Sequence, residues 1–310
     1  MLMTRTDSLR AVLVSVIWGV NFVAIDASLG DFPPFLLAAL RFALVAFPAV
    51  LFVKRPQVGW RVLVGVGLTV NVGQFAFLFS AMHAGMPAGL SSVVIQCQAM
   101  FTVLGAVVLL REIPGRTRLI SLGLAAAGMA VIAFGRGQGA SVWPFLLVLG
   151  AGASWGLGNV LTRKAGIPGG LGLVVWSALV APLPLLALSL TVEGPTKDWE
   201  SLTTASWSGV AGLAFTVALS SWLGYGMWFA LLSRHSASAV APYGLLVPIV
   251  GILTAWAVLG ERPTWIEATG AAVVVIGIAL ASLPRRTPPA TAQIRHPAPT
   301  PVPAIDARSS

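Results

Sequence analysis

The sequence contains one apolar unit used twice. Residues 65–128 align with residues 214–277, 149 positions later, without a gap. Eight positions keep the same residue in both copies: Ala81/Ala230, Ala88/Ala237, Leu104/Leu253, Ala106/Ala255, Leu110/Leu259, Glu112/Glu261, Pro114/Pro263 and Gly128/Gly277. If each copy crosses a bilayer an odd number of times, the second is inserted upside down relative to the first. Inverted repeats of this kind place two mirror-related gates around one central site.

The composition excludes an ordinary soluble domain. Hydrophobic residues make up 57% of the 310-residue chain and charged residues only 9%, whereas a soluble domain carries about 25% charged residues. The formal charge of +9 could suggest nucleic acid, but the basic residues form short clusters between apolar runs. That pattern is typical of membrane topology and not of a phosphate-binding patch. We therefore expect a lipid bilayer and no nucleic acid as partner.

Ten stretches approach the ~20 apolar residues that a membrane-spanning helix needs. They are 9–28, 35–53, 62–82, 88–110, 118–135, 142–162, 171–191, 208–232, 237–259 and 265–283. The sequence thus predicts an all-α polytopic membrane protein with ten transmembrane helices in two inverted five-helix repeats. The first repeat takes residues 1–138 and the second residues 139–283. Residues 284–310, rich in Pro, Ala and Arg, have no periodic apolar face and are expected to be a disordered cytoplasmic tail.

The Lys and Arg residues orient the predicted helices. Fifteen of them fall on the side of the N-terminus: Arg5, Arg10, Lys54, Arg55, Arg61, Arg111, Arg116, Arg118, Arg163, Lys164, Arg234, Arg285, Arg286, Arg295 and Arg308. Three fall on the other side: Arg136, Lys197 and Arg262. Basic residues favour the cytoplasmic side, so both termini are predicted to be cytoplasmic.

Arg41 lies well inside a predicted span, about six residues from its start, roughly 9 Å along a helix. Arginine is costly at such depth unless it reaches the interface or a partner. One interpretation is structural: Arg41 snorkels, or pairs with Asp26 at the outer end of the first helix. The other is functional: Arg41 is a fixed cation near the outer mouth that attracts a substrate carboxylate. Both can hold together.

Other polar residues at mid-depth mark a second candidate feature. Trp18 and Asn21 in the first span correspond to Trp155 and Asn159 in the sixth. Each pair either lines one wall of a cavity or fills the packing between helices. Further polar or aromatic candidates are Asn71, Gln74, Gln96, Gln98, Trp222, Tyr225, Trp228 and Tyr243. An amide-rich wall facing an aromatic-rich one suits a small amphipathic or zwitterionic solute better than a bare ion.

Two glutamates sit at equivalent helix ends. Glu112 and Glu261 are expected to cap a helix or to pair with Arg116 and Arg262. No Asp or Glu lies at mid-depth, where a proton relay is normally found, so downhill or facilitated export becomes more plausible than coupling through a buried carboxylate. The sequence also lacks metal-ligand spacing among its three His residues and a Gly-x-x-x-x-Gly-Lys loop. We expect no cofactor, no metal and no enzymatic activity. A channel is kept as an alternative to a carrier.

These motifs resemble the EamA branch of the drug/metabolite transporter superfamily. The resemblance covers nearly the whole chain to about residue 283. The stretches that carry it are 17–23 (IWGVNFV), 40–48 (LRFALVAFP), 85–90 (GMPAGL), 224–226 (GYG), 240–242 (VAP) and 245–248 (LLVP). It departs at Asp26, where members often carry Lys, and at Arg111, where Gly often precedes the glutamate.

The resemblance implies ten helices in two inverted repeats of a bacterial inner-membrane protein, with a central cavity. It implies export of small amino-acid-like metabolites of the O-acetylserine/cysteine class. Carried over residue by residue, it places eight side chains near that cavity: Trp18, Asn21, Arg41, Gln96, Gln98, Trp155, Asn159 and Tyr225. A multidrug or nucleotide-sugar-type carrier on the same scaffold is the alternative, and a non-transporting membrane scaffold the third.

Overall fold

Helices occupy every one of the ten apolar stretches in the computed structural model, which describes residues 3–137, 140–166 and 170–281. Those residues contain no strand, so the predicted all-α class is confirmed. Within the described ranges, eight helices are long and apolar enough to cross a membrane, or nine if the bent pair Leu171–Ala178 and Pro182–Glu193 (41°) counts as one span; a shorter apolar helix covers Trp265–Leu280. The predicted tail, residues 284–310, lies outside the described residues.

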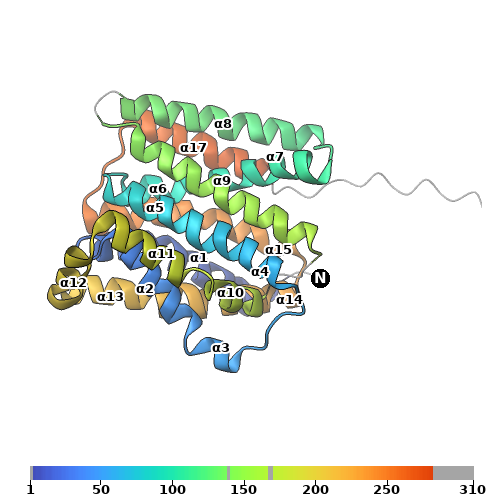
Figure 1. The fold of residues 1–310 in the computed structure, drawn as a ribbon. Helices are drawn as coiled ribbons and strands as arrows, with labels where there is room; N and C mark the ends of the chain where they lie inside the picture. The colour runs from blue at the N-terminus through green and yellow to red at the C-terminus, as the bar shows by residue number, and fades with distance from the viewer. Residues whose placement is uncertain (1–2, 138–139, 167–169, 282–310) are drawn as a thin grey trace, which may run out of the picture.

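The first half of the chain supplies eight helices and two irregular segments (Figure 1). They are α1 (Arg5–Leu29), α2 (Pro34–Ala46), α3 (Ala49–Phe52), α4 (Trp60–Val66), the π-helical η1 (Gly67–Gly73), α5 (Gln74–His83), α6 (Ala88–Val94), the 3₁₀ segment η2 (Ile95–Cys97), α7 (Gln98–Leu110) and α8 (Arg116–Gly137). Proline or glycine precedes α2, α4 and α6, as expected at helix starts.

The second half follows the same order with one insertion. It comprises α9 (Trp143–Lys164), α10 (Leu171–Ala178), α11 (Pro182–Leu188), the π-helical η3 (Ser189–Glu193), α12 (Pro195–Thr204), α13 (Trp207–Ala214), the π-helical η4 (Phe215–Gly224), α14 (Tyr225–Arg234), α15 (Ala237–Val240), the 3₁₀ segment η5 (Ala241–Leu245), α16 (Leu246–Thr254), the π-helical η6 (Ala255–Leu259) and α17 (Trp265–Ala281). The short polar helix α12 is the insertion; it lies in the connection from Glu193 to Ser206.

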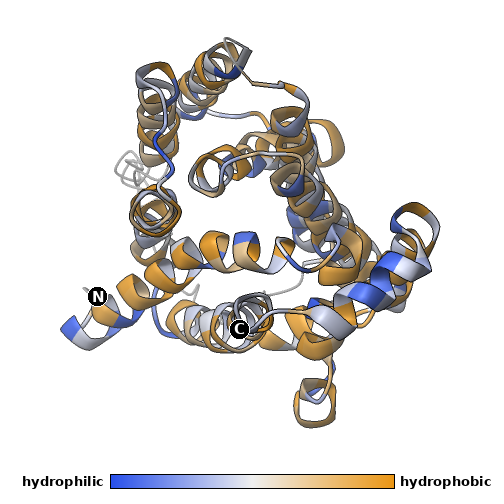
Figure 2. Cartoon of the chain, turned by 90° about the vertical axis from the view of Figure 1, so that its left-hand side faces the viewer, coloured by the Kyte–Doolittle hydropathy of each residue, from blue (hydrophilic) through white to orange (hydrophobic). Residues whose placement is uncertain are grey.

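The helices run roughly along one axis, so the bundle has two ends (Figure 1). We call the end where α1 begins the N-terminal end, and the opposite end, beside α12, the far end. α1 is central and contacts α13, α16, α6 and α5, while α8 packs along α17. The ribbon consists largely of apolar residues (Figure 2), and large apolar side chains such as Leu51, Val108 and Leu183 are more than two-thirds exposed. Such a surface fits lipid.

At the far end, carboxylates join segments distant in sequence. Glu193 accepts hydrogen bonds from the backbone N–H groups of Phe35 and Leu36 at 2.9 and 3.2 Å, which caps α2. Asp31 accepts one from the backbone of Ser206 at 3.1 Å. These contacts fix the helix that carries Arg41 against the second half of the chain.

Candidate functional site

A cavity of about 440 Å³ lies between the two halves of the chain. Its walls come from α1, α2, α5, η2, α7, α9, η4, α14, η5, α16 and α17. All eight residues singled out from the sequence line it: Trp18, Asn21, Arg41, Gln96, Gln98, Trp155, Asn159 and Tyr225. The structure thus brings together side chains that span more than 200 positions of sequence.

Arg41 is the only charged side chain among the described lining residues. It is 3% exposed, so it does not snorkel, and it forms no ion pair with Asp26 or any other described carboxylate. Nη2 donates to Ser221 Oγ at 3.3 Å, and the guanidinium carbon lies 4.2 Å from the ring centroid of Phe75. Nε and Nη1 have no hydrogen-bond partner in the described chain. The guanidinium is held in place with two donors left for an anion.

Two buried amides share the cavity with Arg41. Asn21 and Gln74 are 7% and 5% exposed, and Asn21 Oδ1 and Gln74 Oε1 accept no hydrogen bond from the described residues. An unsatisfied buried polar group costs about 1–3 kcal/mol. Both line the same cavity as the arginine, so the site holds two buried acceptors and a buried cation whose hydrogen-bonding groups lack partners among the described residues.

Aromatic side chains form another wall. The Trp18 ring lies 5.3 Å from that of Tyr225 and 5.2 Å from that of Trp228, and Tyr225 stacks on Phe229 at 6.2 Å. Trp18 Nε1 donates to the backbone oxygen of Ser220 at 3.0 Å, which fixes the indole against η4. A Cβ on Gly224 would lie 2.6 Å from that nitrogen, so glycine is needed for this approach.

The remaining predicted residues form the wall on α7 and α9. Asn159 Nδ2 donates to Gln98 Oε1 at 2.9 Å and to Thr102 Oγ1 at 3.1 Å, so this amide pair bridges the two helices. Gln96 lies in the 3₁₀ segment η2, where the helix is interrupted. Gln96, Gln98 and Trp155 all line the cavity.

Of the further polar and aromatic candidates, some line the cavity and others do not. Gln74 and Trp228 line the cavity; Asn71, Trp222 and Tyr243 do not. Asn71 Nδ2 instead donates to Ser177 Oγ at 3.0 Å, and Trp222 Nε1 to the backbone oxygen of Val45 at 3.1 Å.

The lining or supporting residues that sequence reasoning missed include Phe75, Ser220, Ser221 and Phe229. Small hydroxyls and phenylalanines are common in apolar helices, so only their contacts distinguish them. Among the described residues, no group of three His, Cys, Asp or Glu side chains is placed to hold a metal ion.

Comparison with known proteins gives consistent matches. The model of the EamA-like transporter family matches residues 8–134 and again residues 142–283. A protein of Salmonella typhimurium named "Probable amino-acid metabolite efflux pump" is 44% identical over 283 residues, which cover 89% of this chain and 94% of that protein. Its namesake in Escherichia coli is 41% identical over the same coverage.

A solved crystal structure shares the fold. It is 22% identical, with a TM-score of 0.59 over 90% of this chain and 97% of that one. The two family matches, the names of the relatives and the apolar helices of this chain agree on a multi-pass membrane protein that handles a small molecule. The chain belongs to the EamA-like transporter family.

Proposed function

We propose that this protein exports small zwitterionic, amino-acid-like metabolites, of the O-acetylserine/cysteine class, by alternating access. The observation that carries the proposal is the combination in one cavity of a single cation with free donors and two amides with free acceptors. A carboxylate can bind Arg41 Nε and Nη1 together, and such bidentate pairs are short and strong. An ammonium group donates only, which suits Asn21 Oδ1 and Gln74 Oε1.

The other walls fit the remainder of such a solute. Trp18, Tyr225 and Trp228 offer apolar faces with polar tips, and Gln96 adds a donor and an acceptor. The fixed pair of Gln98 and Asn159 supports the opposite wall together with Trp155. The volume of about 440 Å³ falls in the range of small-molecule sites, about 300–1,000 Å³.

Repeated irregularities support ten spans in two inverted repeats. The π-helical segments η1 (67–73) and η4 (215–224) overlap under the 149-position shift of the sequence repeat, and so do η2 (95–97) and η5 (241–245). Discontinuous helices at matching positions of two halves are typical of transporters with a central site. The bacterial relatives and the one-sided distribution of Lys and Arg support an inner-membrane protein with both termini in the cytoplasm.

The competing substrates fit this cavity less well. A cationic drug would meet a buried guanidinium with no carboxylate among the described lining residues. A nucleotide sugar carries two phosphate charges, for which the described lining residues offer Arg41 as the only cation. A carrier function, in place of enzymatic or scaffolding activity, agrees with the names of the relatives.

Counterflow into liposomes tests the proposal. Purified protein is reconstituted in vesicles preloaded with unlabelled O-acetylserine, and uptake of labelled O-acetylserine, cysteine, N-acetylcysteine and ethidium is compared. We expect counterflow of the two zwitterions and little of N-acetylcysteine, which lacks the ammonium group. Ethidium transport with both amino acids ignored would reject the substrate class, and the absence of all flux would reject the carrier.

A further inference from the structure

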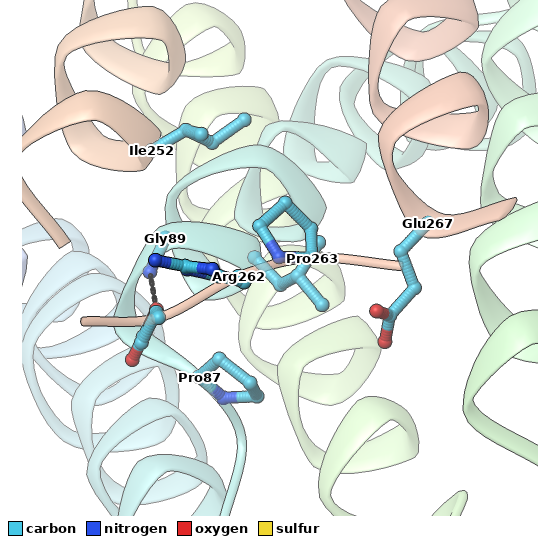
Figure 3. Close-up of a pocket in the computed structure, with 8 residues that line it drawn as sticks. Pro87, Gly89, Ile252, Arg262, Pro263 and Glu267 are labelled. Atoms are coloured by element: carbon cyan, nitrogen blue, oxygen red, sulfur yellow. Dashed lines mark hydrogen bonds between the residues drawn. The ribbon is translucent and has the colours of Figure 1, made fainter. Parts of the chain in front are cut away.

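Glu261 joins the two halves of the chain at the far end of the bundle. Its carboxylate accepts hydrogen bonds from the backbone N–H groups of Ala88 at 2.7 Å and Gly89 at 2.9 Å, where α6 begins. Figure 3 shows the bond at Gly89. The carboxylate satisfies helix N–H groups that otherwise have no partner and lies at the positive end of the helix dipole. A Cβ on Gly89 would lie 3.2 Å from Glu261 Oε2 and from Ile252 Cα, so glycine allows the close contact.

The first half contains the same turn at the other end of the bundle. Glu112 precedes Glu261 by 149 positions, and the residue before each is left-handed: Arg111 at φ 54° and Gly260 at φ 70°. The N–H of Glu112 donates to Ala106 O at 3.2 Å, and that of Glu261 to Ala255 O at 3.3 Å, again a matched pair. Arg111 takes this conformation without being glycine, which is uncommon. The two turns therefore present their carboxylates from the same backbone conformation.

The partners of the two carboxylates differ. Glu112 Oε1 accepts a hydrogen bond from Arg163 Nη2 at 2.6 Å in an ion pair whose side chains are 39% and 46% exposed. Pairs this exposed are weak and exchange readily with water. The positions that correspond to Ala88 and Gly89 are Ala237 and Ser238, which open α15 at the N-terminal end, whereas the Glu112 carboxylate accepts its hydrogen bond from Arg163.

The cavities show the same asymmetry between the ends. A second cavity of about 240 Å³ shares Gln96, Gln98 and Asn159 with the central one. It continues to Arg118 and Leu122 in the first turns of α8, which begins at the N-terminal end. At the far end, where the glutamate is docked, a pocket of about 120 Å³ lined by Gly89, Leu90 and Glu261 (Figure 3) shares no described lining residue with the central cavity, whereas the cavity at the N-terminal end adjoins it.

We propose that Glu112 and Glu261 are reciprocal latches that close the two ends of the bundle in turn. In the opposite conformation, Glu261 releases α6, and Glu112 leaves Arg163 and accepts the backbone N–H groups of Ala237 and Ser238. The inference rests on the proposed alternating access but not on the identity of the solute. It assigns to this glutamate pair a role that capping or surface pairing alone does not imply.

Accessibility of single cysteines tests the exchange. The one native cysteine, Cys97, is 1% exposed and is replaced by alanine to give a clean background. Val103→Cys reports the cavity toward the N-terminal end, and Leu78→Cys, in the far-end half of α5, reports the opposite side. Each reporter is combined with Glu112→Gln, Glu261→Gln or Arg163→Ala, and labelling by a membrane-impermeant maleimide is timed without substrate.

If the two glutamates are reciprocal latches, their variants should shift the labelling rates in opposite directions. Glu261→Gln should speed labelling at Leu78→Cys and slow it at Val103→Cys, by about three- to tenfold, the range expected from loss of a charged helix cap. Arg163→Ala should shift labelling in the same direction as Glu261→Gln, because it frees Glu112 to dock. Glu112→Gln should have the reverse effect. Glu200→Gln, an exposed glutamate of α12, is the matched control and should change neither rate.

Two results would overturn the exchange: equal shifts in the same direction for both glutamate variants, or no change with Glu112→Gln and Arg163→Ala. Counterflow assays on the same proteins separate this outcome from failure of the proposed function. Reciprocal labelling shifts without amino-acid flux would keep the latches and reject the substrate class. Flux that persists with labelling rates unaffected by any variant would keep the carrier and reject the latches.

Discussion

Replacing Arg41 by leucine separates substrate binding from folding. Arg41 is 3% exposed, and two of its three guanidinium nitrogens have no partner in the described chain. A hydrogen bond to a charged group contributes about 1.5–3 kcal/mol, and each 1.4 kcal/mol is a factor of ten. Loss of the carboxylate contact should therefore weaken substrate affinity by roughly tenfold to a hundredfold.

Stability should respond in the opposite direction. The guanidinium is a buried charge without an ion-pair partner in the described chain, and removing such a charge in favour of an apolar side chain of similar volume is neutral or stabilising. We expect the Tm of Arg41→Leu in detergent to be unchanged or raised, while the Tm increase caused by added O-acetylserine disappears. Arg41→Lys should keep part of the affinity, since it retains charge but not the planar donor pair.

Arg55 provides the matched control, because its guanidinium also lies 4.2 Å from an aromatic centroid, that of Trp60, but outside the cavity. Arg55→Leu should leave substrate affinity unchanged. The assay is a substrate titration by thermal shift, paired with counterflow in liposomes. Unchanged affinity in Arg41→Leu, or equal losses in both variants, would refute the assignment of Arg41 as the carboxylate site.

Four other substitutions have defined outcomes. Gln74→Leu and Asn21→Leu each remove a buried acceptor without a partner in the described chain, so substrate affinity should fall while Tm holds or rises; a lowered Tm with affinity intact would show that the amides are structural. Gly224→Ala places a Cβ 2.6 Å from the indole nitrogen of Trp18 and should cost about 1–3 kcal/mol by overpacking, whereas Gly226→Ala, with nothing within 4 Å of its Cβ, should not lower stability; denaturant unfolding compares them. Trp18→Phe keeps an aromatic ring but loses the 3.0 Å hydrogen bond to Ser220 O, and should lower the free energy of unfolding by about 0.5–1.5 kcal/mol. Unchanged stability together with tighter substrate binding would show that this hydrogen bond does not stabilise the fold.

The sequence alone predicted the helices and the set of candidate residues. A chain with 9% charged residues has few ways to place a polar group inside an apolar span, because lipid gives it no partner. Polar side chains such as Asn21, Arg41 and Asn159 therefore had to face a cavity or another helix, and all eight predicted site residues line one cavity. Their role in binding stays a prediction.

Only the tertiary structure decided which polar groups face each other. Asn71 and Gln74 are three residues apart in one predicted span, yet Asn71 bonds to Ser177 while Gln74 opens to the cavity. The π-helical segment η1 ends between them and changes the rotation of the residues that follow. Hydropathy depends on residue type alone, whereas the direction of a side chain depends on helix rotation, local irregularity and the neighbouring helix. The same reason explains why the repeat predicted two equivalent glutamates, but only packing distinguishes the docked Glu261 from the exposed Glu112.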